Sequence, residues 1–116
     1  MAGALCNRRV WARWLLATTV TGPVYEELLF RGFLLPSLAL WLPPWAAVAL
    51  SSLVFALTHG NVAHLWRYWW GGCLFGWCYA NTGNLLAPIV LHSAFNFLAA
   101  AELLWYQRQH SFKLSA

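Results

Sequence analysis

Charged side chains are scarce in this chain of 116 residues, since Asp, Glu, Lys and Arg together make up only 9% of it. A typical soluble domain carries about 25% charged residues. This shortage excludes a disordered tail and a coiled coil, both of which depend on charged residues. The net charge of +4 arises from seven scattered basic residues and three acidic ones, without a basic stripe, so we expect no nucleic-acid partner.

Cysteine is also sparse, and Cys6, Cys73 and Cys78 form no paired pattern. An odd, unpatterned set argues against a disulfide framework and a zinc ribbon. The chain has no internal repeat and no low-complexity tract. Its apolar runs are continuous and do not alternate as membrane strands would, so we expect helices.

Long uncharged runs are what the chain has in abundance. Hydrophobic residues make up 61% of it, with nine Trp and seven Phe. No charged residue occurs in the 35 positions between Arg31 and Arg67, or in the 34 between Arg67 and Glu102. A membrane-crossing helix needs about 20 mostly apolar residues, and aromatic residues gather at the membrane interfaces. We therefore predict a multi-pass integral membrane protein.

Turn and breaker residues divide the chain into predicted helices at about 23–42, 45–59, 68–80 and 85–108. The breaks are Pro43-Pro44, a loop at 61–67 and a turn at 81–84. The predicted fold class is all-α: a small bundle of about four transmembrane helices, with a partial helix before Gly22. Three glycines in the third helix should let helices approach closely; they are Gly71, Gly72 and Gly76.

The chain divides into an N-terminal basic flank at 1–20, one helical domain at 21–108 and a polar tail at 109–116. Arg8, Arg9 and Arg13 place the N-terminus in the cytoplasm by the positive-inside tendency. A bundle this thin leaves homo-oligomer formation open, and the lipid bilayer is an expected partner.

Three charges lie close together on an otherwise apolar helix: Glu26, Glu27 and Arg31. A charge at mid-bilayer costs about 2.5–3.5 kcal/mol on insertion scales, so each of them needs a partner or a function. Glu27 and Arg31 are four residues apart and can pair. Glu26 is rotated by about 100° from Glu27, which predicts that Glu26 is the free acid aimed into the bundle. Alternatively, both acids simply favour a helix N-terminus.

Two further polar sets lie on apolar helices. His59 closes an aromatic-x-x-x-His pattern with Phe55, and His92 and Asn96 are one helical turn apart. Taken singly, His59 is explained as a helix cap, and the His92 and Asn96 pair as helix-to-helix hydrogen bonding. Taken together, a glutamate and a histidine can activate a water, and two donors can stabilise an oxyanion. The three sets therefore predict amide hydrolysis within a membrane.

These three motifs resemble the signatures of the CPBP family, the CAAX-prenyl-protease and bacteriocin-processing (Abi) intramembrane proteases. The resemblance runs from about Thr21 to Phe97 and keeps the motif order. It implies an intramembrane protease-like helical domain that cleaves a peptide bond in a membrane-associated or lipid-modified protein or peptide. It assigns water activation to Glu26 and His59, the oxyanion hole to His92 and Asn96, and a bracing role to Glu27 with Arg31.

The resemblance leaves two mechanisms open. Members have been described both as metalloproteases and as metal-independent glutamate enzymes. Glu26, His59 and His92 could bind zinc, leaving a fourth position for water, although no His-Glu-x-x-His motif is present. Two other classes remain as alternatives: a non-catalytic immunity or scaffold factor that keeps the polar cluster for helix packing, and a small transporter or channel subunit.

Overall fold

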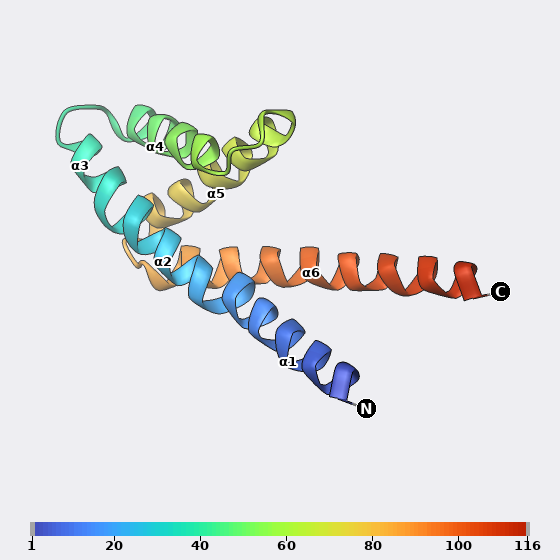
Figure 1. Cartoon of the computed structure of the whole chain (residues 1–116). Helices are drawn as coiled ribbons and strands as arrows, with labels where there is room; N and C mark the ends of the chain where they lie inside the picture. Colours follow the sequence, from blue (N-terminus) through green and yellow to red (C-terminus); the bar gives the residue numbers. More distant parts are fainter. Residues whose placement is uncertain (1, 116) are drawn as a thin grey trace. The chain divides into compact units, whose positions relative to one another are not determined.

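The computed structural model of the chain describes the backbone of residues 2–115 and the side chains of residues 7–110. This part of the chain is almost entirely helical and contains no strand, which confirms the predicted all-α class (Figure 1). The elements are α1 (Ala2–Leu16), the π-helical segment η1 (Ala17–Thr21), α2 (Gly22–Leu29), the π-helical segment η2 (Phe30–Leu34), α3 (Leu35–Ala39), α4 (Pro44–Thr58), the 3-10 turn η3 (Val62–His64), α5 (Leu65–Thr82) and α6 (Leu86–Ser115).

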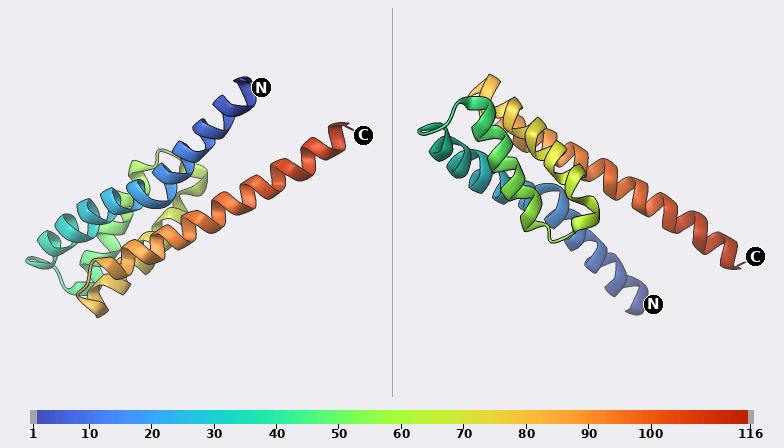
Figure 2. Two further views of the ribbon diagram at one scale, coloured as in Figure 1. Left: turned by 90° about the horizontal axis from the view of Figure 1, so that it is seen from below. Right: turned by 90° about the horizontal axis from the view of Figure 1, so that it is seen from above.

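The chain forms two compact units. The larger unit comprises Val24–Leu91, and the smaller unit comprises Met1–Pro23 together with His92–Ala116. In the larger unit α4 packs along α5 and also contacts α3 and η2 (Figure 2). Its core is formed by Leu35, Ala47 and Val48, with partly buried hydrophobic side chains around them. One of these, Cys73, is a free thiol, as is Cys78.

The first π segment explains how the helix passes Pro23, which the sequence predicted as its beginning. A proline inside a helix has no N–H, and its ring clashes with the carbonyl of the residue four positions earlier. At η1 the N–H of Gly22 reaches back five residues to the oxygen of Ala17, so the backbone widens just before Pro23. Helix therefore runs through residues 2–39, and the basic flank is helical where we expected only a partial helix.

The same local arrangement recurs at Pro36. The N–H of Leu35 reaches back to the oxygen of Phe30 at the end of η2. Pro36 follows directly, inside the first turn of α3. Both π segments thus end one residue before a proline, and they flank the segment that carries the acidic pair.

The remaining boundaries differ modestly from those predicted. The predicted loop at 61–67 contains η3, where the side-chain oxygen of Asn61 accepts from the N–H of Ala63, and α5 already begins at Leu65. The α5 helix ends at Gly83, whose φ of 62° is the left-handed conformation that glycine adopts without strain. The predicted polar tail is part of α6, which continues to Ser115. The side chain of Cys6 lies outside those described.

One stretch of the described residues, Leu86–His110, has both the length and the apolar composition to cross a membrane. The helix Pro44–Thr58 is apolar but shorter. At 1.5 Å per residue its 15 residues span about 22 Å, less than the hydrocarbon thickness of about 30 Å. That four helices cross the membrane therefore stays a prediction.

Candidate active site

A buried ion pair anchors the first motif. Arg31 Nη1 lies 3.1 Å from Glu27 Oε1, and the two side chains are 1% and 0% exposed. The pair predicted from the four-residue spacing therefore forms. Arg31 Nη2 also donates a hydrogen bond of 2.7 Å to the backbone oxygen of Gly72. Because a buried charge is tolerated only when it is paired and hydrogen-bonded, these contacts fasten the η2 segment to α5.

Two aromatic rings and a glycine complete the surroundings of the guanidinium. The Arg31 Cζ lies 4.7 Å from the centroid of Phe55 and 5.4 Å from that of Phe75, distances typical of cation–π contacts. A Cβ on Gly72 would stand 3.0 Å from the Cβ of Ser52 and 3.2 Å from Arg31 Nη2. The missing side chain at Gly72 therefore lets α5 approach α4 and Arg31 this closely, as we predicted for this glycine, whereas Gly71 makes no such close approach.

Glu26 is half-buried beside this ion pair. Its carboxylate attracts the Arg31 guanidinium electrostatically, in addition to the attraction from Glu27. Glu26 therefore also interacts with a partner, while its predicted role as the acid aimed into the bundle stays a prediction. The rotation of successive residues by about 100° gives Glu27 the direct contact with Arg31.

The second motif fixes the orientation of an imidazole. His59 caps the C-terminus of α4, and its Nδ1 lies 2.8 Å from the backbone oxygen of Phe55, four residues earlier. A carbonyl oxygen can only accept, so Nδ1 carries the hydrogen. In the neutral ring Nε2 then carries the lone pair, as a base or a metal ligand requires.

Ring packing holds this imidazole in place. The His59 ring stacks on Tyr68, with centroids 4.2 Å apart and planes inclined by 20°. It also meets the Phe55 ring edge-on at 4.6 Å. Phe55 contacts both Arg31 and His59, and so connects the first motif to the second. Tyr68 was missed in the sequence, because nothing in its local pattern shows which residue of the next helix faces the histidine.

The third motif lies on α6, in the smaller unit. The His92 side chain is 4% exposed and is not without an interaction partner. The side-chain amide of Asn96 donates a 2.7 Å hydrogen bond to the backbone oxygen of Thr18. Glu26 and His59 belong to the larger unit. The convergence of the two pairs on one site therefore stays a prediction.

The structure does not test the predicted zinc site. Within Val24–Leu91, the described side chains contain no group of three or more His, Cys, Asp or Glu placed to hold a metal ion. The predicted zinc ligands Glu26, His59 and His92 include a residue from each unit, so this set also stays a prediction. The orientation of the His59 ring suits either function, because Nε2 is the atom that would bind zinc.

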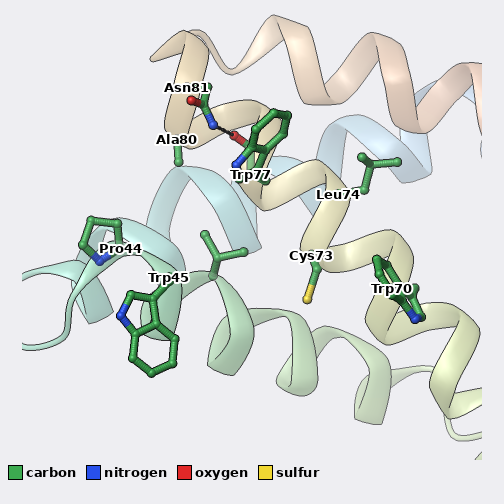
Figure 3. A pocket seen from close by; sticks show the side chains of 9 residues that line it. Pro44, Trp45, Trp70, Cys73, Leu74, Trp77, Ala80 and Asn81 are labelled. Carbon is green, nitrogen blue, oxygen red and sulfur yellow. Dashed lines mark hydrogen bonds between the residues drawn. The ribbon is translucent and has the colours of Figure 1, made fainter.

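An apolar groove runs along the larger unit between α4 and α5. Its volume is about 720 Å³, within the size range of ligand pockets. Figure 3 shows three tryptophans around it and the Cys73 sulfur pointing toward α4. Its polar edge is Asn81, whose amide donates to the backbone oxygen of Trp77 at 2.9 Å. The lining residues are Pro44, Trp45, Val48, Trp70, Cys73, Leu74, Trp77, Ala80 and Asn81.

Comparison with known proteins bears out the predicted resemblance. A protein of Bacillus subtilis (strain 168) named "Putative membrane peptidase YdiL" is 29% identical over 82 residues, which cover 71% of this chain and 34% of that protein. The chain thus spans about one third of the length of this relative. No solved structure matches the present chain significantly. The profile of the type II CAAX prenyl endopeptidases of the Rce1-like kind matches residues 8–98, which include all three motifs. The chain belongs to the Rce1-like family of type II CAAX prenyl endopeptidases.

Proposed function

We propose that this chain is an intramembrane endopeptidase that hydrolyses a peptide bond of a membrane-associated or lipid-modified protein or peptide. The observation that carries the proposal is the family match across residues 8–98, which contains the acidic pair, His59 and the His92–Asn96 pair. Two local features support it: the buried ion pair beside Glu26, and the His59 ring with its Nε2 available for chemistry.

In the proposed reaction Glu26 and His59 hold a water, and the Glu26 carboxylate takes its proton as the oxygen attacks the substrate carbonyl carbon. The negative charge that forms on the carbonyl oxygen is stabilised by donors from His92 and Asn96. As the carbon–nitrogen bond breaks, the proton passes from Glu26 to the leaving amine. Water is thereby divided between the new carboxylate and the new amino terminus.

Glu27 and Arg31 have a bracing role in this proposal. Their contacts with each other and with Gly72 hold the segment that carries Glu26 against α5. The donor capacity of Asn96 also fits, because its amide has two hydrogens and the Thr18 oxygen takes only one of them. Zinc bound by Glu26, His59 and His92 would instead lower the pKa of the attacking water.

The groove between α4 and α5 supports the substrate class. A space of about 720 Å³ lined mainly by apolar and aromatic side chains, without a charged one, suits a linear hydrocarbon or an apolar side chain better than a charged group. We propose that it receives the apolar part of the substrate.

The proposal predicts that replacing Glu26 removes proteolysis. Glu26→Gln keeps the shape of the side chain but cannot take a proton, so cleavage of a lipid-modified peptide by the purified protein in liposomes should fall by about 10²–10⁴-fold. Glu102→Gln is the matched control, because Glu102 is an exposed acid on α6 and its loss should leave cleavage unchanged.

Two outcomes separate the alternatives. Cleavage by Glu26→Gln at the rate of the unsubstituted protein rejects Glu26 as the base. Loss of cleavage to a chelator, followed by recovery with added zinc, favours the metal mechanism with the same three side chains. A folded protein that cleaves nothing in any of these assays favours the packing role instead.

A further inference from the structure

Asn96 fastens α6 to one particular backbone carbonyl. Its Nδ2 donates to the oxygen of Thr18 at 2.7 Å. In an α-helix this oxygen would accept from Gly22, and in a π-helix it would accept from residue 23. The N–H of Gly22 instead bonds the oxygen of Ala17, and residue 23 is a proline without an N–H. Neither of these nitrogens therefore serves the Thr18 carbonyl.

The neighbouring hydroxyls do not take their place. Thr18 Oγ1 donates to the oxygen of Trp14 at 2.9 Å, and Thr19 Oγ1 donates to the oxygen of Leu15 at 2.6 Å. These bonds all point to the preceding turn. Thr18 is half-buried, and carbonyls in such surroundings almost always find a donor. The Asn96 amide supplies it.

We propose that Pro23 is a positioning residue for Asn96. By lacking an N–H it leaves the Thr18 carbonyl for the Asn96 side chain, which fixes the plane of the amide. One amide hydrogen is held by Thr18, so the second has a defined direction, as a preorganised oxyanion donor requires. This inference rests on the proposed function for its link to catalysis, and on the hydrogen bond alone for its link to structure.

The test is to restore the missing donor. Pro23→Ala gives residue 23 an N–H that can bond the Thr18 oxygen and displace Asn96. With asparagine-selective ¹⁵N labelling of the whole chain in detergent micelles, the Asn96 side-chain amide should shift and exchange its hydrogens with water at least tenfold faster. Pro36→Ala is the matched control, because Pro36 also follows a π segment and should leave the Asn96 signal unchanged.

Measurements of kcat and KM distinguish a failure of this inference from a failure of the proposed function. Pro23→Ala should lower kcat while KM stays within twofold, and adding Asn96→Ala should cause little further loss. If the Asn96 amide is released but cleavage persists, Asn96 has no catalytic role and the positioning contact still stands. If the amide signal and its exchange are unchanged in Pro23→Ala, the inference is wrong.

The unsubstituted protein provides a second test that does not depend on the folding of any variant. One amide hydrogen of Asn96 should exchange much more slowly than those of the exposed Asn84. Equal exchange rates for Asn96 and Asn84 would overturn the inference.

Discussion

Glycine at position 72 has a structural consequence that its neighbour at 71 does not share. A Cβ at residue 72 would meet Ser52, Phe55 and Arg31 at 3.0–3.2 Å. A Cβ at residue 71 would have the Phe75 ring 3.9 Å away, which is an ordinary contact. The backbone oxygen of Gly72 also accepts from Arg31. Packing around the ion pair thus depends on one missing side chain.

We therefore expect Gly72→Ala to destabilise the protein and Gly71→Ala to leave it unchanged or more stable. Overpacking typically costs about 1–3 kcal/mol, whereas alanine in place of glycine inside a helix contributes about 0.5–1 kcal/mol. Denaturant unfolding of the two variants in the same detergent measures the difference. Equal effects of the two substitutions would mean that the ion pair tolerates a wider separation of α4 and α5.

Short-range contacts of the site were predictable and long-range ones were not. The Glu27–Arg31 pair follows from a spacing of four residues, and the spacing of Phe55 and His59 likewise brings their side chains to one face. The partners Gly72 and Tyr68 depend on how α5 packs on α4, which no local pattern specifies.

At the scale of elements, the helix boundary that we predicted from a proline is absent from the structure. Pro23 predicted a helix start, since proline disrupts a regular helix. The helix continues through Pro23 and Pro36 instead, because the backbone widens into a π segment just before each of them and so relieves the clash of the ring with the preceding turn. The ends of α4 and the turn near Gly83 were predicted within a few residues, because Pro43-Pro44 and the glycines carry strong local signals.

The groove between α4 and α5 predicts unequal roles for two similar tryptophans of α5. Trp77 and Trp66 are 63% and 64% exposed, but only Trp77 lines the groove. Trp77→Ala should raise KM for a lipid-modified peptide several-fold, because it removes packing contacts with the apolar part of the substrate. It should leave kcat unchanged, because Trp77 is not one of the proposed reacting groups. Trp66→Ala should leave KM unchanged. Equal KM values for both variants and the unsubstituted protein would place the apolar part of the substrate elsewhere.

At the scale of the whole molecule, the arginines of α1 predict its orientation in the membrane. Arg8, Arg9 and Arg13 favour a cytoplasmic N-terminus, and an even number of crossings would return Arg108 to the same side. A fluorescent protein fused to either end should therefore fluoresce in the bacterial cytoplasm, whereas alkaline phosphatase fused there should be inactive. An active phosphatase at the C-terminus would mean an odd number of crossings.

The proposed mechanism requires Glu26 and His59 to meet His92 and Asn96 around one water. Cysteine cross-linking tests it directly, in a chain whose own cysteines are replaced by alanine. The Glu26→Cys/His92→Cys pair should be joined within one chain by a short bifunctional thiol reagent in liposomes. The control pair Glu26→Cys/Leu103→Cys should not react, because Leu103 lies about 16 Å further along α6. A Glu26–His92 pair that cross-links no better than this control would contradict the proposed mechanism.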